Sequence, residues 1–570
     1  MQIIKRLFIL HFFIAPFFAL AQSSNLNQGS KEQYLIERLM ILQPGGDPSL
    51  LFTGFKPYNR KHLVEQTGHI LKYCVSASDT HNLTSIQSGC LLSRVDRANL
   101  QSILVGNHEW DDSEAMFHVS RKTFGPFYKT KADFFSVDEK DFFLSVNPVL
   151  QLKYGHSGDS AGSPFLNSRG ITLRGLIAGK LGFSSTVIEN QERGPYFYHK
   201  QVSDARAVPG VGFYKTFKGT ALDYFDARGY VSFNAAKYVD IQFGFDKHFI
   251  GNGFRSLFLS DWGNSYLFLK FNTRIWKLNY QNLYMELMPQ FSRALGNTLL
   301  DRKYAAMHHL SVNVKPWLNI GFFESVVFGR TNRFDFQYLN PIIFFRHVEG
   351  ALGSKDNAIA GFEFKTNLRR RVQLYGQWIL DEFLIGKVKS DPTNWVNKFG
   401  FQMGGKYVDA FGIRNLDLQV EWNRVRPFTY SHKDSVANYT HYNQPLAHPL
   451  GSNFRELVGI VRYQPTPRWV INARLIGYFK GLDSNNANFG GNIFRDYASR
   501  VAETGFKVGS GNRVDCINAL AVISYEFREN LFFECSYLYR SLSSGKTESE
   551  KTNLISAGIR MNMYRRDYDF

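Results

Sequence analysis

The sequence Val239-Asp-Ile-Gln-Phe-Gly-Phe245 alternates apolar and polar side chains, and the same pattern continues through residues 238–288. A second run places Leu267, Leu269, Phe271, Thr273 and Ile275 opposite Tyr266, Lys270, Asn272 and Arg274. A third places Leu283, Met285 and Leu287 opposite Asn282, Tyr284 and Glu286. A period of two predicts strands with one apolar and one polar face. A soluble sandwich turns the apolar face inward, whereas a membrane barrel turns it to lipid and lines its lumen with the polar face.

The N-terminus favours the membrane barrel. A basic start at Lys5 and Arg6, an apolar run over residues 7–20 and the small residues Ala19 and Ala21 predict a secretory signal peptide over residues 1–21. The alternative is an N-terminal anchor, but the run is short for a membrane span. The remaining chain has no apolar run of helical span length, so a spanning protein must be a closed barrel.

Composition agrees with a barrel in an exported protein. Aromatic residues make up 16% of the chain, with 52 Phe and 29 Tyr, although the mean hydropathy is slightly negative. Such a balance is typical of alternating strands with aromatic girdles. The net charge of +18 favours anionic lipid headgroups or acidic polysaccharide as partners, or a solvated lumen and loops; nucleic acid is not expected for an exported protein.

The chain divides into two regions after the signal peptide. Residues 22–130 predict a mostly helical periplasmic head, with helix-like spacing after the capping pattern at Ser30, over residues 91–104 and over residues 113–119. Cys74 and Cys90 lie close enough in this region to pair, whereas Cys516 and Cys535 fall on opposite strand faces.

Residues 131–570 predict the barrel. Strand patterns lie at 142–154, 170–188, 310–315, 319–329, 358–366, 372–380, 399–407, 416–422, 457–463, 469–479, 517–527, 531–539 and 554–564, as well as within 238–288. Together they predict about 16–18 strands, an even number. The polar segments 431–455 and 482–513 predict external loops. The terminal aromatic Phe570 is typical of the assembly signal of outer-membrane barrels, although Arg565-Arg-Asp-Tyr-Asp569 separates it from the last strand.

Several separated motifs resemble the Wzi-like capsule-assembly barrels, and most closely their RemB-type gliding-motility branch. They include Asp246-Lys-His-Phe-Ile-Gly-Asn-Gly-Phe-Arg-Ser-Leu-Phe-Leu-Ser-Asp261, Lys303-Tyr-Ala-Ala-Met-His-His-Leu310, Phe322-Phe-Glu-Ser-Val-Val-Phe-Gly-Arg330, Tyr338-Leu-Asn-Pro341, Gly353-Ser-Lys-Asp-Asn357, Tyr375-Gly-Gln-Trp-Ile-Leu-Asp-Glu382 and His441-Tyr-Asn-Gln-Pro-Leu-Ala-His-Pro-Leu-Gly-Ser-Asn453. The resemblance implies an all-β, antiparallel transmembrane barrel of about 18 strands with a helical head. It also implies handling of surface polysaccharide, with gliding or export machinery as further partners.

Motifs for catalysis are absent from the sequence: it has no HExxH, GxSxG or Walker loop. Gly251-Asn-Gly253 reads as a tight turn that needs positive φ. His308 and His309 point to opposite faces, and so do the adjacent carboxylates Asp381 and Glu382, so neither pair predicts a metal or glycosidase site. We therefore expect a protein that is not an enzyme and has no cofactor or metal.

The polar residues of the predicted barrel favour a role in binding over a role in catalysis. Polar and charged side chains that face the lumen are predicted to pair across strands and brace the wall, or to bind a glycan or small solute. They are Lys270, Arg274, Tyr284, Glu286, Glu363, Lys365, Tyr375, Asp417, Glu421 and Arg474. The residues within the family-like motifs predicted to form a glycan-binding or lumen network are Arg255, Asp261, Glu324, Arg330, Arg346, Glu349 and Asp381. The leading hypothesis is an outer-membrane barrel, in contact with outer-membrane lipid and lipopolysaccharide, that assembles or attaches polysaccharide or supports gliding. The alternatives are a channel for a small solute and, less favoured, a barrel enzyme that acts on lipid or sugar.

Overall fold

The fold was analysed in a computed structural model that describes residues 23–42, 52–74, 92–111, 127–159, 162–289, 300–330, 333–342, 344–353, 356–382, 385–545 and 547–570. Within these residues, no helix is both long and apolar enough to cross a membrane. The predicted signal peptide, the predicted helix at 113–119 and Cys90 lie outside the described residues.

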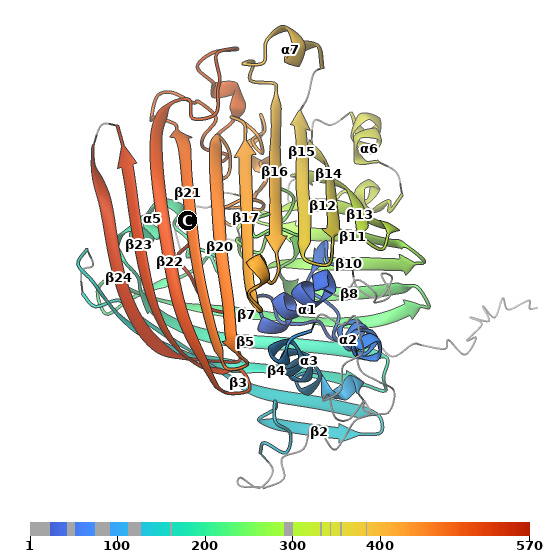
Figure 1. The fold of residues 1–570 in the computed structure, drawn as a ribbon. Helices are drawn as coiled ribbons and strands as arrows, with labels where there is room; N and C mark the ends of the chain where they lie inside the picture. Colours follow the sequence, from blue (N-terminus) through green and yellow to red (C-terminus); the bar gives the residue numbers. More distant parts are fainter. Residues whose placement is uncertain are drawn as a thin grey trace, which may run out of the picture.

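Eighteen of the described strands close into an antiparallel barrel (Figure 1). The barrel closes where β24 pairs with β3, from Leu554 opposite Ser157 to Met561 opposite Leu150. The wall strands are β3 (Phe142–Ser157), β4 (Phe165–Ile177), β5 (Leu181–Arg193), β7 (Ala221–Ala236), β8 (Val239–Asp246), β10 (Tyr266–Ile275), β11 (Leu278–Leu287), β12 (Lys303–Lys315), β13 (Leu318–Phe328), β14 (Asn357–Leu368), β15 (Val372–Glu382), β16 (Lys398–Tyr407), β17 (Leu416–Val425), β20 (Phe454–Thr466), β21 (Trp469–Leu482), β22 (Asn512–Arg528), β23 (Leu531–Ser544) and β24 (Thr547–Met561). The predicted barrel of about 18 strands is confirmed.

Several short elements accompany the wall strands. β2 (Phe135–Glu139) pairs with β3, and β6 (Lys215–Phe217) pairs with β7. Away from the wall, β1 (Phe55–Lys56) pairs with β9 (Phe249–Ile250), and β18 (Thr440–His441) pairs with β19 (Gln444–Pro445). Helices between wall strands are α5 (Tyr196–Ala205), α6 (Phe345–Leu352) and α7 (Ile385–Ser390), with 3-10 turns η2 (Phe336–Leu339), η3 (Ala410–Gly412), η4 (Ser435–Ala437) and η5 (Tyr497–Ser499).

The wall alternates as its sequence predicts over most strands. On β8, Phe243 and Phe245 are exposed on the outside while Gln242 is buried, and on β10 Leu267 lies outside while Lys270 is buried inside. The apolar side chains therefore face outward, as they do in a barrel surrounded by lipid.

β11 reverses this pattern and corrects the prediction. Leu283 pairs with Lys270 and so faces inward, as does Met285, whereas Tyr284 and Glu286 face outward rather than into the lumen. The cause is packing on both sides of the wall: the lumen next to β11 is filled by apolar residues, and the outer face of Tyr284 is covered by η2 and α6. Alternation gives the period of a strand but not the direction of its apolar face.

The three N-terminal helices α1 (Lys31–Leu42), α2 (Arg60–Cys74) and α3 (Arg94–Val105) share a core and lie at the end of the barrel where short turns join the strands (Figure 1). η1 (His108–Trp110) follows α3. Arg38 of α1 forms ion pairs with Asp96 of α3, with Asp409 in the β16–β17 turn and, at 2.8 Å, with Asp417. The helices predicted near 31–42 and 91–104 are present, whereas α2 was not predicted.

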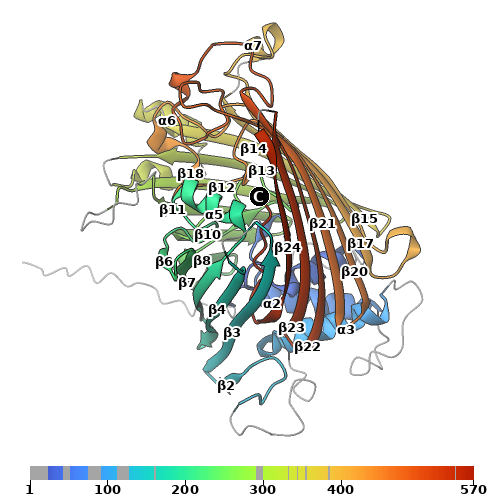
Figure 2. The ribbon, with the colours of Figure 1, turned by 90° about the vertical axis from the view of Figure 1, so that its left-hand side faces the viewer.

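Three further expectations need correction. Residues 170–188 belong to two strands, because the chain turns at residues 178–180, and β7 was not predicted. The segment 431–455 is not an external loop: Tyr439, Leu446 and Ala447 are buried in the barrel core, as is the preceding Tyr430. The chain after β24 also turns into the lumen, where Figure 2 shows the C-terminus. There Phe570 packs against Phe197 and Trp262.

Candidate functional site

The lumen is filled by a plug that begins in the β8–β10 connection, residues 247–265. Leu257, Phe258 and Leu259 of this segment are almost completely buried and belong to the barrel's main hydrophobic core. β9 pairs with β1, so the head and the segment meet inside the barrel. Gly251 has a φ of 139° and Gly253 approaches the wall closely, which explains the Gly-Asn-Gly turn.

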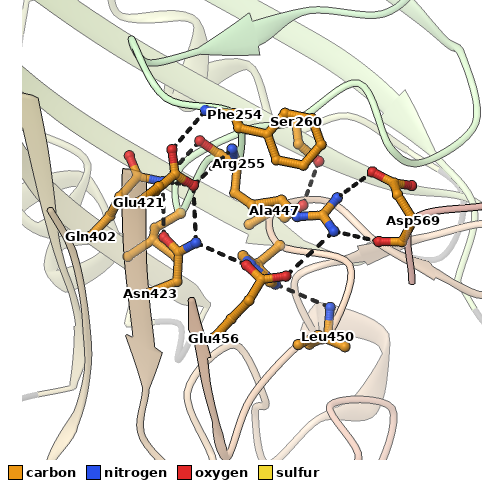
Figure 3. Close-up of polar contacts among 12 residues, drawn as sticks. Phe254, Arg255, Ser260, Gln402, Glu421, Asn423, Ala447, Leu450, Glu456 and Asp569 are labelled. Atoms are coloured by element: carbon orange, nitrogen blue, oxygen red, sulfur yellow. Dashed lines mark hydrogen bonds and ion pairs between the residues drawn. The ribbon is translucent and has the colours of Figure 1, made fainter. Parts of the chain in front are cut away.

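Glu421 of β17 holds the plug to the wall. Its carboxylate accepts hydrogen bonds from the backbone N–H groups of Phe254 (2.7 Å) and Arg255 (3.0 Å) (Figure 3). It also accepts a hydrogen bond from the Tyr375 hydroxyl at 2.8 Å. Gln402 of β16 donates to the carbonyl of Arg255 at 2.9 Å. A carboxylate this deeply buried is stable only when several donors satisfy it, so Glu421 has a structural role at this position.

Arg255 links the plug to two other parts of the chain. Its guanidinium forms an ion pair with Asp569 at 2.9 Å and with Glu456 of β20 at 3.4 Å (Figure 3). Burial lowers the pKa of Arg255, but Asp569 and Glu456 outweigh it and raise the pKa above the ordinary value. Asp569 belongs to the C-terminal segment, residues 562–570, which enters the lumen after β24. The ion pairs therefore join the plug, the wall and the C-terminal segment.

The connection between β17 and β20 supplies the second half of the plug. The hydroxyls of Tyr430 and Tyr439 donate to the carbonyls of Leu257 and Phe258, both at 2.7 Å. Its end near the wall is fixed by Asp381 of β15, which accepts the Tyr430 N–H at 2.6 Å. Asp381 also forms a buried ion pair with Lys398 at 3.1 Å.

A second polar cluster lies on the outside of the barrel beneath α6. Glu324 contacts the His308 ring at 2.7 Å and accepts the N–H of Phe345 at the start of α6 (3.1 Å). The Phe345 ring stacks on His308, with centroids 4.1 Å apart. His309 points the other way, into the lumen, and contacts Glu363 at 2.9 Å. The prediction that the two histidines diverge is confirmed.

The seven residues predicted to form one network occupy three places. Arg255 and Asp261 line the lumen, and Asp381 fixes the second half of the plug. The other four lie on the outside of the barrel, within or beside the segment that contains η2 and α6. Arg330 of that outer group forms ion pairs with Asp356 (2.6 Å) and Asp335 (3.5 Å). The other three outer residues are Glu324, described above, and Arg346 and Glu349, which pair with each other on α6 at 2.8 Å.

Sequence reasoning missed the roles of Glu456 and Tyr430, and it classed Glu421 only as a lumen-facing charge. The alternation on β17 could have marked Glu421 as buried, but nothing local to Tyr430 indicates that its loop folds inward. Cys516 is buried and Cys535 is exposed, and both are free, in agreement with their predicted opposite faces. Among the described residues, no three His, Cys, Asp or Glu side chains are placed to hold a metal ion.

These features define a closed, plugged β-barrel with an apolar outer wall. The model of a family described as capsule assembly protein Wzi matches residues 219–476, which is less than half of the chain. The search of curated proteins finds no match.

Solved structures resemble the fold. Wzi from Escherichia coli, described as an outer-membrane protein involved in group 1 capsule assembly and a carbohydrate-binding β-barrel, aligns with a TM-score of 0.56 and 13% identity, covering 95% of this chain and all of that one. OprD from Pseudomonas aeruginosa gives 0.41 and 10%, over 73% of this chain and 94% of that one. OccAB2 from Acinetobacter baumannii gives 0.42 and 10%, over 73% and 97%. The similarity to Wzi shows the fold alone, and the other two are too distant to carry an argument.

Proposed function

We propose that the chain is a Wzi-like outer-membrane barrel that attaches or assembles surface polysaccharide and catalyses no reaction. The observation that carries this proposal is the plug, in which two wall connections and the C-terminal segment fill the lumen around Arg255. A barrel filled in this way suits binding at its surface better than the passage of solutes. The family match over residues 219–476 and the shared fold with a carbohydrate-binding barrel support the same function.

The orientation follows from the usual arrangement of such barrels. Short turns face the periplasm and long connections face outward. On this basis we propose that the head, residues 22–130, lies in the periplasm after removal of the signal peptide at residues 1–21, and that residues 131–570 lie in the outer membrane. The long connections at the other end, including residues 483–511, then meet polysaccharide, while the apolar belt contacts lipid and lipopolysaccharide.

The proposal is tested by retention of polysaccharide. In a strain lacking the gene, cell-bound surface polysaccharide should fall and released polysaccharide should rise, with total synthesis unchanged. The purified barrel should also bind that polysaccharide in a pull-down. Unchanged retention together with no binding would refute the proposal.

A solute channel is the alternative, and the plug argues against it. In planar bilayers the intact protein should give no steady open conductance; a large, stable pore would favour the channel instead. The gliding role implied by the resemblance stays a prediction, as does an association with gliding or export machinery. Loss of colony spreading on deletion, with retention unaffected, would favour gliding over polysaccharide attachment.

A further inference from the structure

A cavity of about 730 Å³ lies in the lumen between the plug, the N-terminal helices and the wall of β20–β24. Its volume is within the range of roughly 300–1,000 Å³ found for small-molecule sites. Fourteen Lys and Arg side chains line it, against seven Asp and Glu, and part of this positive excess is balanced by carboxylates behind the wall, such as Asp226 beside Arg228 and Glu534 beside Arg560. Such an excess around a confined space attracts anions.

Some of these cations are already satisfied by carboxylates and some are not. Lys247, Arg462, Arg468 and Arg528 form no ion pair with a carboxylate among the described residues. Arg462 instead lies over the Tyr34 ring at 3.9 Å, and Lys247 donates to the carbonyl of Gly210 at 2.5 Å. Arg462, which is half-buried, therefore retains its attraction for an anion, whereas burial lowers the pKa of Lys247 to about 7, so this amine carries only part of a positive charge at neutral pH.

Two arginines of the cavity wall already bind carboxylates of the chain itself. Asp567 and Asp569 of the C-terminal segment lie in this cavity, where Arg474 contacts Asp567 at 3.3 Å and Arg255 contacts Asp569 at 2.9 Å. Guanidinium groups bind carboxylate and phosphate through N–H donors, so these two contacts show that the arginines of the cavity wall accept an anionic group.

The access route is at the short-turn end. Arg468, in the β20–β21 turn, and Arg528, at the end of β22, are exposed and yet line the cavity. They therefore form a positively charged rim beside the N-terminal helices, at the end opposite the long connections. The side chains of Phe254 and Trp262 also line this cavity.

We propose that this cavity is a binding site for a small solute bearing a carboxylate or a phosphate group, which enters from the short-turn end. The site is separate from the polysaccharide-binding surface proposed above, and it does not depend on that function. Two classes of compound carry such a group: acidic sugars such as uronates, which have a carboxylate, and phosphate-bearing compounds.

The test uses the full chain in detergent micelles and isothermal titration calorimetry with galacturonate, inorganic phosphate and neutral galactose. At low ionic strength we expect binding of galacturonate or phosphate, weakening in high salt, and no binding of galactose. Binding of only one anion assigns the source to that chemistry. Equal binding of galactose and galacturonate, or no binding of either anion, overturns the proposal.

Rim variants locate the site. Arg468→Gln with Arg528→Gln should weaken anion binding by about tenfold or more, as expected for the loss of charge-assisted hydrogen bonds. Both residues are exposed, so the barrel should fold normally, which the heat-dependent mobility of the barrel in gels verifies. The matched control is Arg414→Gln, because Arg414 is an exposed arginine of the β16–β17 turn that does not line the cavity. Unchanged affinity in the double variant, or an equal loss in the control, would place the binding elsewhere and overturn the proposal.

Discussion

Glu421→Ala is the substitution that most directly tests how the lumen is closed. The side chain is completely buried, and it accepts the backbone N–H groups of Phe254 and Arg255 as well as the Tyr375 hydroxyl. Alanine leaves both backbone groups without their acceptor. At about 1–3 kcal/mol for each buried N–H left unpaired, the plug loses roughly 2–6 kcal/mol of its attachment to the wall.

The barrel itself should survive this change, because the wall is held by its own strand pairing on both sides of β17. The effect should instead appear as more frequent release of the plug. Even a loss of about 2 kcal/mol raises the population of the released state about 30-fold. We expect faster amide hydrogen exchange over residues 247–265 and intermittent conductance steps in planar bilayers, both absent from the unmodified protein.

A suitable control is Glu189→Ala, which removes a carboxylate from the outer face of β5, where it pairs with exposed Arg169. This variant should change neither exchange in the plug nor conductance. If Glu421→Ala leaves plug exchange and conductance unchanged while the barrel stays folded, Glu421 does not hold the plug and the reasoning is wrong.

Three other perturbations have defined outcomes. Burial raises the pKa of Glu37, but Lys406 and Lys56 outweigh it and lower the pKa below 4.5. The ion pairs of Glu37 with Lys56 of the head and with Lys406 of β16 therefore stabilise the fold fully above about pH 4.5, and this contribution is lost as the pH falls below that value; Glu37→Gln should flatten this acid dependence, measured by protease cleavage of the head. Asp381→Ala removes the buried ion pair with Lys398 and the acceptor of the Tyr430 N–H and should cost about 3–5 kcal/mol, seen as a lower unfolding temperature that Glu189→Ala does not share. Ile342 is 83% exposed on the outer wall; in lipid, Ile342→Trp fluorescence should be quenched by brominated phospholipid, and unquenched emission would place this segment in water.

Most of the wall was predictable from sequence because most strands carry their own signal, although β7 was missed and β4 and β5 were predicted as one strand. Phe243 and Gln242 alternate in a period that only a strand can produce, and similar runs recur along the chain. The direction of each face was less predictable. On β11, the inward Leu283 is stabilised by plug residues that lie far away in sequence, so no local pattern identifies it.

The plug was not predictable for the same reason. Residues 431–455 have the polar, aromatic composition of an external loop, yet Tyr439 and the preceding Tyr430 are buried, and their hydroxyls donate hydrogen bonds to backbone carbonyls of the plug. The predicted network was likewise split between the lumen and the outer wall, since motif membership says nothing about which side of the wall a residue occupies. Arg255 and Asp261 were placed correctly in one region only because they share a short connection.

The Gly-Asn-Gly turn explains why the plug acts as a unit. A Cβ at Gly253 would lie 2.5 Å from the Glu421 carboxylate and 2.8 Å from the Arg255 carbonyl, so a side chain there would push the backbone away from its acceptor. The glycine is therefore required for the two N–H groups to reach Glu421, and their position in turn directs the Arg255 guanidinium towards Asp569 and Glu456. Glu421 of β17, Glu456 of β20 and Asp569 of the C-terminal segment all contact Arg255, so release of any one of them weakens the attachment of the others. A lumen closed in this interdependent way opens as a whole or not at all, which suits a binding barrel better than a gated channel.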